Sequence, residues 1–250
     1  MPESLLLLPP GLDLLPAVGL VVLSFVTSAI TATFGLGGGA MLIAVMVLVL
    51  PPVVAVPVHG LVQFGSNAGR AILMRAHVQW RFAGYFLLGS AAGALLGGRV
   101  ATMLPEAVFT ALIAIFILWS AWAPKPSGTA RGPLATAAAG LVTAAIGMIT
   151  GVSGPLVIAF LRFLPDRHQI IATHALLMTA QNAFKAVAFA AFGFAFVPYL
   201  PLVALMVATG FAGTWTGRRL LARVPEQGFR WGFRIILSLV AVNLLWAAIT

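Results

Sequence analysis

The sequence predicts an all-α membrane protein. We expect a polytopic helical bundle of about eight full transmembrane helices plus two short broken or re-entrant helices, in two internal repeats of inverted orientation. The first observation is composition: 61% of the 250 residues are hydrophobic, 8% are charged, and the mean hydropathy is +1.08. The second is that apolar stretches near the roughly 20 residues a spanning helix needs follow one another almost end to end. The third is that the alternation typical of transmembrane strands is missing, which argues against a barrel.

The apolar segments fall into two series of five, and the second segment of each series is very short. In the first repeat, residues 1–123, the expected helices are 14–34, 40–50, 53–74, 82–103 and 106–123. In the second repeat, residues 134–250, they are 134–152, 155–164, 168–192, 198–217 and 231–248. A polar connector at 124–133 separates them. A helix of eleven residues rises only about 16 Å, so each short segment needs non-helical backbone beside it to cross.

The two series are related by internal duplication. A shift of 115 residues superimposes several polar and glycine positions: Gly39 on Gly154, His59 on His174, Asn67 on Asn182, and Arg70 on Lys185. After a five-residue insertion, a shift of 120 pairs further positions: Arg99 with Arg219, Pro105 with Pro225, Glu106 with Glu226, and Phe109 with Phe229. Matches at a constant shift over this length predict an internal duplication.

Positive charges predict how the repeats are oriented. If the short segments change sides, loops 75–81, 124–133, 165–168 and 218–230 face one side together with twelve of the fourteen Lys and Arg residues. If they do not, six arginines move to the opposite side. The positive-inside rule favours the first arrangement. We therefore expect inverted repeats, a cytoplasmic connector and both termini outside. The net charge of +9 is explained by this pattern, and nucleic-acid binding is not expected.

A glycine-rich break precedes each short segment. The first is Gly35-Leu36-Gly37-Gly38-Gly39, and the second is Gly151-Val152-Ser153-Gly154-Pro155. Glycine lets a ligand approach the backbone closely, Ser153 suits a helix N-cap, and Pro155 suits a first helical turn. Unpaired N–H groups at such breaks, around residues 37–41 and 153–157, would be satisfied by an anion. The alternative is that these glycines only permit close helix packing.

A polar stripe follows each break on a single helical face. The first stripe is His59, Gln63, Ser66, Asn67 and Arg70, and the second is His174, Met178, Gln181, Asn182 and Lys185. Ionisable groups at membrane depth normally face a cavity or a partner. A row of Ser24, Thr27, Ser28 and Thr31, with Thr143, Gly147 and Thr150 on the matching helix, is expected to line the same cavity. The competing interpretation is that Arg70 reaches the membrane surface and that the amides only join helices.

The five acidic residues all fall near expected loops or helix ends. A carboxylate proton relay is therefore not expected, and the site should be positively charged. His59 and His174 are the groups available for coupling to protons, because only imidazole titrates near neutral pH. Their alternative role is packing, and coupling to sodium stays open. The chain contains no cysteine, which excludes disulfides, thiolate metal sites and thiol catalysis. We expect no metal and no cofactor.

The two glycine-rich breaks, the duplicated apolar halves, and the polar segments with Asn67 and Asn182 resemble the TauE/SafE family of sulfite exporters and sulfonate permeases. The resemblance covers roughly residues 14 to 248. It implies secondary transport of sulfite, organosulfonates or related oxyanions, through a bundle usually counted as about eight helices. The second break departs from a full glycine run through Val152, Ser153 and Pro155.

We therefore expect a secondary transporter of a small anion, not an enzyme. The expected substrate-binding residues are Gly37, Gly38, Gly39, Gln63, Ser66, Asn67, Arg70, Ser153, Gly154, Gln181, Asn182 and Lys185. Residue chemistry supports an anion and does not separate sulfite from sulfonate, carboxylate or phosphate. Three alternatives are a passive anion channel, a rhomboid-like serine protease and a membrane scaffold. The protease is considered because Gly151-Val152-Ser153-Gly154 matches Gly-x-Ser-Gly with His174 as base, and the scaffold would have no need for the duplicated breaks. The expected location is a bacterial inner membrane, with the lipid bilayer as partner and a homodimer open.

Overall fold

The computed structural model describes residues 8–34, 37–123, 132–220 and 226–249. Within these ranges every regular element is helical. The α-helices are α1 (Leu14–Phe34), α2 (Gly38–Val49), α3 (Pro52–Leu73), α4 (Trp80–Ala101), α5 (Glu106–Trp122), α6 (Pro133–Thr150), α7 (Gly154–Leu161), α8 (Arg167–Ala191), α9 (Leu200–Leu220) and α10 (Glu226–Ile249). Two 3-10 turns, η2 (Arg75–His77) and η3 (Val197–Tyr199), precede α4 and α9.

These helices occupy the expected apolar segments, including the two short ones. The largest difference is α10, which begins at Glu226 and not at residue 231. Glu226 is the residue paired with Glu106, the first residue of α5, at the shift of 120. The early residues of α10 are too polar to have been counted as membrane-spanning, although they continue the same helix. Most of the connector, residues 124–131, lies outside the described residues.

Length and hydropathy identify four candidate membrane spans among the described residues: Leu14–Thr33, Pro133–Thr150, Val197–Gly217 and Trp231–Ile249. The apolar helices α2 and α5 are shorter. Helices α3 and α8, with 22 and 25 residues, are long enough, but they carry the polar stripes. The expectation of about eight full spans thus stays a prediction, because polar interior helices lower the hydropathy on which a span is recognised.

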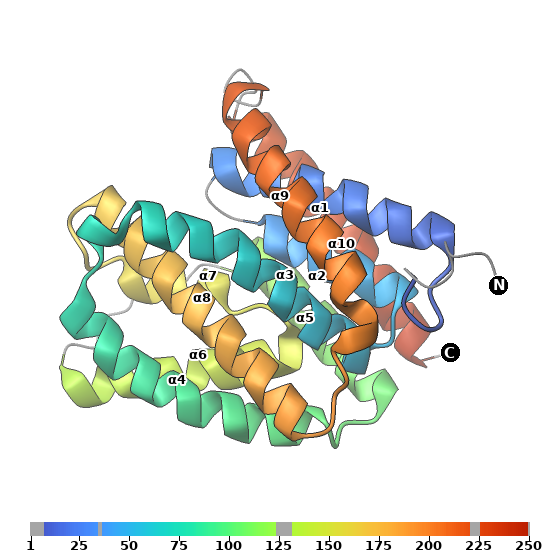
Figure 1. The fold of residues 1–250 in the computed structure, drawn as a ribbon, viewed down its shortest axis with the longest axis horizontal. Coiled ribbons are helices and arrows are strands. Elements are labelled where there is room, and N and C mark those ends of the chain that lie inside the picture. The colour runs from blue at the N-terminus through green and yellow to red at the C-terminus, as the bar shows by residue number, and fades with distance from the viewer. Residues whose placement is uncertain (1–7, 35–36, 124–131, 221–225, 250) are drawn as a thin grey trace.

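Each principal helix contact joins the first half of the chain to the second. Helix α4 packs along α6, α1 along α9, α3 along α8, and α5 along α10. In Figure 1, the α1 and α9 pair lies at the upper right, the α4 and α6 pair at the lower left, and α3 and α8 between them. The sequence halves therefore interlock and do not form two separate bundles.

Glycines bring the paired helices into backbone contact. On α4, the face with Gly93 and Gly97 lies against the backbone of Leu141 and Ala145 on α6. On α9, Gly213 and Gly217 lie in the same way against α1. Gly93 pairs with Gly213, and Gly97 with Gly217, at the shift of 120. Small residues four apart allow this approach in membranes, where dispersion and polar contacts replace the hydrophobic driving force.

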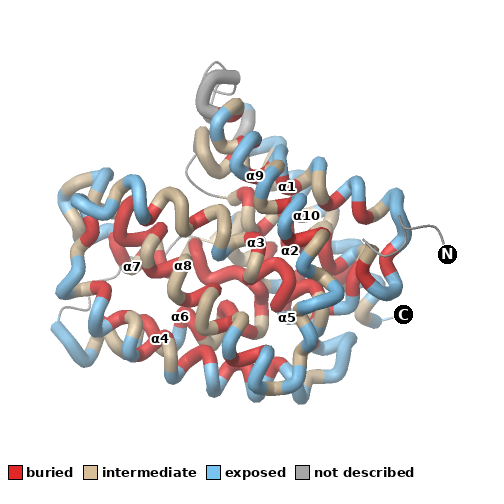
Figure 2. Tube along the Cα trace, in the orientation of Figure 1, coloured by how far each residue is buried: buried red, intermediate tan, exposed pale blue. Residues whose placement is uncertain are grey.

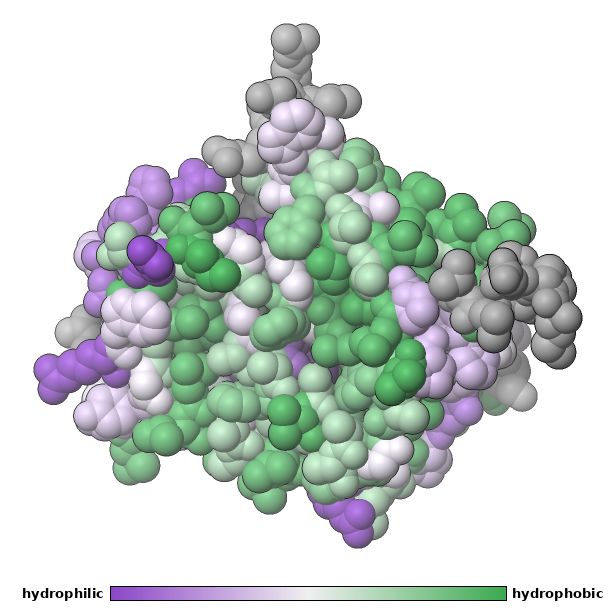
Figure 3. Space-filling view, viewed as in Figure 1, coloured by the Kyte–Doolittle hydropathy of each residue, from purple (hydrophilic) through white to green (hydrophobic). Residues whose placement is uncertain are grey.

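Buried residues concentrate on the inner helices, while the outer surface is apolar. Figure 2 shows burial running along α2, α3, α8 and the inner faces of α4 and α6. Large hydrophobic side chains stand exposed on the outside, among them Leu15, Leu73 and Leu134, each more than 80% exposed. Figure 3 shows hydrophobic side chains over most of the visible face, with hydrophilic ones gathered toward its edges. Soluble monomers rarely expose an apolar area of this extent, so the surface is suited to lipid.

Candidate functional site

The two breaks position the starts of the short helices in the interior. Gly37, the N-cap of α2, has φ of 102°, and Gly151, which ends α6, has the left-handed φ of 77°. Both conformations favour glycine because a Cβ atom would be strained there. Helix α2 then packs back against α1, where a Cβ on Gly38 would meet the carbonyl of Thr27. Gly35 and Leu36, which belong to the first break, lie outside the described residues.

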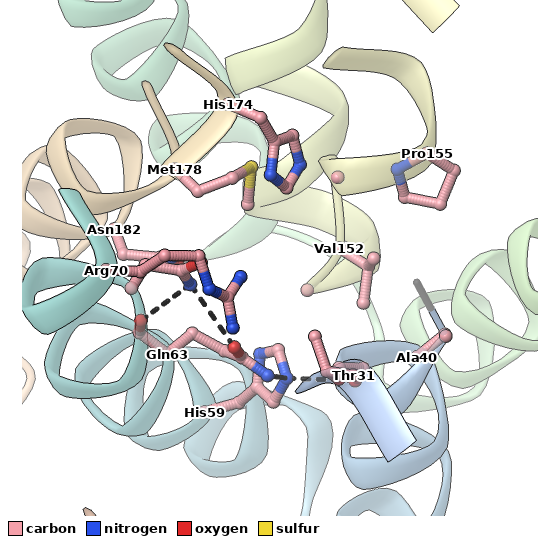
Figure 4. Close-up of a pocket in the computed structure, with 15 residues that line it drawn as sticks. Thr31, Ala40, His59, Gln63, Arg70, Val152, Pro155, His174, Met178 and Asn182 are labelled. Atoms are coloured by element: carbon pink, nitrogen blue, oxygen red, sulfur yellow. Dashed lines mark hydrogen bonds between the residues drawn. The ribbon is translucent and has the colours of Figure 1, made fainter. Parts of the chain in front are cut away.

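A cavity of about 70 Å³ lies where the two breaks and the two polar helices meet (Figure 4). It receives side chains or backbone from both halves of the chain. Its lining comprises Thr31, Gly37, Gly39, Ala40, His59, Gln63, Asn67, Arg70, Gly151, Val152, Gly154, Pro155, His174, Met178 and Asn182. Nine of the fourteen residues that the sequence singled out for binding or coupling are in this set: Gly37, Gly39, His59, Gln63, Asn67, Arg70, Gly154, His174 and Asn182.

On the first half, one hydrogen bond joins the polar stripe of α3 to the start of α2, and further contacts link the stripe's own side chains. The Nε2 atom of His59 lies 3.0 Å from the carbonyl oxygen of Gly39, and the amide nitrogen of Gln63 lies 3.2 Å from the same Nε2. Asn67 donates from Nδ2 to the carbonyl of Gln63 at 2.8 Å. Since a carbonyl only accepts, the contact with Gly39 requires the tautomer of His59 with its hydrogen on Nε2, and in that tautomer the amide nitrogen of Gln63 is a close neighbour of Nε2 and not a hydrogen-bond donor to it. Asn67 Nδ2 also lies 3.4 Å from Oε1 of Gln63, so the side chains at positions 59, 63 and 67 lie next to one another in one row along the cavity.

Arg70 supplies the charge of the cavity. Its guanidinium points into the space enclosed by the lining in Figure 4. No acidic residue belongs to the lining, and the described acids Asp13, Glu106 and Asp166 lie at or next to helix starts. A guanidinium is charged at all physiological pH values and presents five N–H donors. The cavity therefore offers a positive charge and hydrogen-bond donors to whatever it holds.

Three buried polar atoms of the lining residues have no hydrogen-bond partner among the described residues. They are Nδ1 of His59, Nε2 of His174 and Nδ2 of Asn182. A buried polar group without a partner costs about 1–3 kcal/mol, so such groups are rarely retained without a use. All three belong to duplicated positions of the polar stripes. The cavity is thus suited to a polar ligand.

On the second half, the corresponding side chains make contacts within the protein. Lys185 is only 4% exposed, is absent from the cavity lining, and donates from Nζ to the carbonyl of Gly151 at 2.9 Å. Ser153 Oγ donates to Oε1 of Gln181 at 2.7 Å. The amide of Gln181 donates at 3.0 Å to the hydroxyls of Ser90 and Thr143. The second break is therefore fastened to α4, α6 and α8.

Gly38 and Ser66 are the other two expected binding residues that do not line the cavity. Gly38 lies against α1, and Ser66 is half-buried on α3. The two breaks also differ in backbone donors. Pro155 has no N–H group, and the N–H groups of Leu156 and Val157 both donate to the carbonyl of Ser153 at 3.0 Å. The N–H groups of Leu156 and Val157 are therefore used at the start of α7 itself, and the binding of an anion by backbone N–H groups around residues 37–41 and 153–157 stays a prediction.

Two lining residues carried no chemical signal in the sequence. Ala40 and Val152 are apolar and reach the cavity only because they flank the breaks. Thr31 was expected through the Ser/Thr face, and its hydroxyl donates to the carbonyl of Thr27 at 2.9 Å. Met178 pairs directly with Gln63 at the shift of 115. Its thioether makes the second wall less polar than the first.

The geometry does not support a serine protease. The Oγ of Ser153 donates to Gln181, and Nε2 of His174 has no hydrogen-bond partner among the described residues. A nucleophilic serine requires its base within hydrogen-bonding reach and a third group that orients the base. Ser153 is also buried, with 4% exposure, and lies outside the cavity lining.

Comparison with known proteins gives one family. A family model described as "Sulfite exporter TauE/SafE" matches residues 20–244, which include both breaks, both polar stripes and the whole cavity lining. No curated protein matches the chain, and no solved structure matches it.

Proposed function

The chain belongs to the TauE/SafE sulfite exporter family, and on that premise we propose that it is a secondary transporter of a small sulfur oxyanion, sulfite or an organosulfonate, which binds in the cavity. A multi-pass membrane transporter follows from the family and from the apolar helices. The substrate and the way in which transport is driven are our proposal.

The observation that carries the proposal is the combination of charge and unpaired donors in the cavity. Arg70 is the charged member of the described lining apart from the two titratable histidines, and no carboxylate opposes it. Asn182 Nδ2 can only donate, and it has no partner among the described residues. A cation would lack its counter-charge here, whereas an oxyanion would accept from both groups. The start of α2 adds backbone N–H groups of the first turn, beside the lining residues Gly39 and Ala40.

The cavity volume supports a small ligand. A single water needs about 10–15 Å³ on this measure, so about 70 Å³ suits a few waters or one small oxyanion. Sulfite fits this description more closely than a bulky aromatic sulfonate. An organosulfonate would have to place its carbon chain toward Val152, Met178 and Ala40, which form the apolar part of the lining.

We propose that access alternates by relative movement of two units, each of which contains helices from both repeats. One unit is α1, α2, α3 and α9, and the other is α6, α7, α8 and α4. The close contacts α1–α9 and α4–α6 fall within the units, while α3 and α8 meet between them beside the cavity. Each unit thus holds three helices of one repeat and one helix of the other, and in folds built from inverted repeats alternating access is commonly rocking about the site.

The remaining parts of the proposal concern orientation and coupling. The charge pattern favours a cytoplasmic connector and both termini outside, in the inner membrane of a bacterium. The start of α1 and the end of α10 lie at the same end of the molecule in Figure 1, as an even number of passes requires. His59 and His174 line the cavity, so these imidazoles would carry a coupling proton, and sodium is the alternative coupling ion. Assembly as a homodimer is a separate part of the proposal.

The test is anion flux in proteoliposomes, comparing sulfite, sulfoacetate, taurine and chloride. We expect saturable sulfite flux that falls at least about tenfold in Arg70→Ala and Asn67→Ala. Arg99→Ala is the matched control, because Arg99 is an exposed cation at the end of α4, away from the cavity. Equal losses in Arg70→Ala and Arg99→Ala would refute the site.

Saturation separates the transporter from an anion channel. A transporter binds its substrate once in each cycle, so flux levels off as sulfite rises, whereas a channel passes ions at rates that stay nearly proportional to concentration. Fast flux that does not saturate would favour the channel. No flux of any of the four anions would refute the proposed function.

A further inference from the structure

We infer that the two duplicated cations have different tasks: Arg70 contacts the transported anion, while Lys185 is a positioning residue that holds the second break in place. This inference rests on the proposed function, because it assumes that the cavity takes an anion. It differs from what the duplication alone predicts, which is the same role for both residues.

The ammonium group of Lys185 donates a hydrogen bond to the backbone and does not face the cavity. Its Nζ donates to the carbonyl of Gly151 at 2.9 Å, and Gly151 is the left-handed residue directly after the last turn of α6. The last carbonyls of a helix carry partial negative charge and have no partner within the helix. A buried ammonium at this point stabilises both the helix end and the sharp turn that follows. The bond therefore fixes the backbone immediately before Val152, which lines the cavity.

A glycine on the facing helix makes room for this contact. A Cβ atom at Gly60 on α3 would lie 2.8 Å from Cδ of Lys185, closer than side chains approach without a shift. The aliphatic stem of Lys185 therefore passes over Gly60 on its way to Gly151. The position that pairs with Gly60 at the shift of 115 is Ala175, so the passage is not duplicated.

Arg70 has the chemistry and the location of a residue that binds the anion. It lines the cavity, and its guanidinium points into it (Figure 4). A planar guanidinium can donate two parallel hydrogen bonds to two oxygens of one oxyanion, whereas an ammonium acts as a point charge. Arginine at the cavity and lysine at a single carbonyl are thus the residue types that each task requires.

Neighbouring contacts indicate that the two breaks also differ in task, the first in binding the anion and the second in supporting the cavity wall. Ser153 and Gln181 are held in a network with hydroxyls of α4 and α6, and Pro155 withholds a backbone donor. On the first side, the row from His59 to Arg70 faces the cavity directly. The first half therefore supplies most anion ligands, and the second half supplies a fixed wall together with Asn182 and His174.

The test uses single cysteines, since the chain has none of its own. A thiol introduced by Val152→Cys reports on the backbone that Lys185 holds, and one introduced by Ala40→Cys is the matched control at the first break. Both sites are buried lining positions beside a break. Labelling by a small maleimide in membranes is compared with and without Lys185→Met or Arg70→Met, alongside sulfite KM and maximal flux in proteoliposomes.

We expect Lys185→Met to raise the labelling rate of the Val152→Cys thiol by about tenfold or more and to leave the Ala40→Cys thiol unchanged. Its sulfite KM should change by less than about threefold while maximal flux falls, because the ligand set is intact. Arg70→Met should raise the KM by about ten- to a hundredfold and leave the Val152→Cys labelling unchanged. Lys185→Arg should keep labelling near that of the parent, because it retains a donor for the Gly151 carbonyl.

Equal increases in KM for Lys185→Met and Arg70→Met would overturn the inference and assign both cations to the anion. Unchanged labelling of the Val152→Cys thiol in Lys185→Met would overturn the positioning role by itself. Absence of saturable sulfite flux in the parent protein would instead refute the proposed function, and the labelling comparison would still decide whether Lys185 holds the break.

Discussion

Replacing Gly97 by alanine tests whether glycines set the distance between α4 and α6, which pack together from different halves of the chain. A Cβ at this position would lie 2.7 Å from the Cα of Ala145 on α6, and also 2.7 Å from its carbonyl oxygen. Ordinary contact begins near 3.4 Å, so α4 and α6 would have to separate by about 0.7 Å. Backbone atoms cannot rotate away as a side chain can. The strain therefore weakens the packing of α4 against α6 along its length.

The magnitude follows from a comparison within the same helix. Overpacking of this kind costs about 1–3 kcal/mol. Alanine also gains about 1 kcal/mol over glycine in helix propensity. Gly84 is an exposed residue of α4 with nothing within 4 Å of its Cβ position, so Gly84→Ala makes the same gain without the clash. The difference between the two variants isolates the packing cost of about 1–3 kcal/mol.

The assay is the melting temperature of detergent-purified protein. For a chain of this length, 1 kcal/mol corresponds to about 2–4 °C, so Gly97→Ala should melt about 2–12 °C below Gly84→Ala. Gly217→Ala should behave like Gly97→Ala, since a Cβ at Gly217 would lie 2.5 Å from the Cα of Ala29. Equal melting temperatures for Gly97→Ala and Gly84→Ala would refute the backbone contact between α4 and α6 at Gly97.

Three further changes test the buried contacts and a helix cap. Gly60→Ala should displace the stem of Lys185 and reproduce the labelling phenotype of Lys185→Met, and the double variant should add little, because both changes remove one contact. Gln181→Leu should destabilise the protein by about 1–3 kcal/mol in chemical or thermal melts, because buried hydroxyls lose the amide they contact. The backbone N–H of His168 lowers the pKa of Asp166, which caps α8. That stabilisation is present above the usual pKa of an aspartate and is lost as pH falls through the lowered value, so melting of Asp166→Ala should depend less on acid pH.

Each of these predictions has an outcome that contradicts it. Additive labelling effects of Gly60→Ala and Lys185→Met would mean that they act on different contacts. Gln181→Leu that melts like the parent would remove the network from the structural account of the second break. A melting profile of Asp166→Ala that keeps the acid dependence of the parent would assign that dependence to other groups.

The helix series and the location of the cavity could be predicted from the sequence because both depend on short-range patterns. Apolar length indicates the segments, and glycine runs before the short segments indicate where the backbone turns. The four-residue spacing from His59 to Asn67 places those side chains on one face whatever surrounds the helix. These features do not require knowledge of which helices meet.

The separate roles of Arg70 and Lys185 could not be predicted in this way. Both are lone cations at matching positions of the two polar stripes. The helical spacing of a stripe gives the direction in which a side chain points, but not which residues of other helices lie opposite it. The absence of a side chain at Gly60 on α3 and the position of the Gly151 carbonyl at the end of α6 decide the outcome for Lys185, and both lie on helices other than its own. The same reason explains why Ser153 and Gln181, expected as ligands, contact each other, and why apolar Val152 lines the cavity.

The interlocked halves also limit how the protein can move. If the sequence repeats rocked as rigid bodies, the glycine contacts of α4 with α6 and of α9 with α1 would have to open in every cycle, because each joins one repeat to the other. Those contacts bring backbone against backbone, and opening them would lose dispersion contacts that lipid does not replace closely. The contact between α3 and α8 is different, since polar side chains and the cavity lie beside it. Movement at that contact exposes groups that an anion and water can satisfy. The units that move against each other are therefore expected to differ from the units that were duplicated.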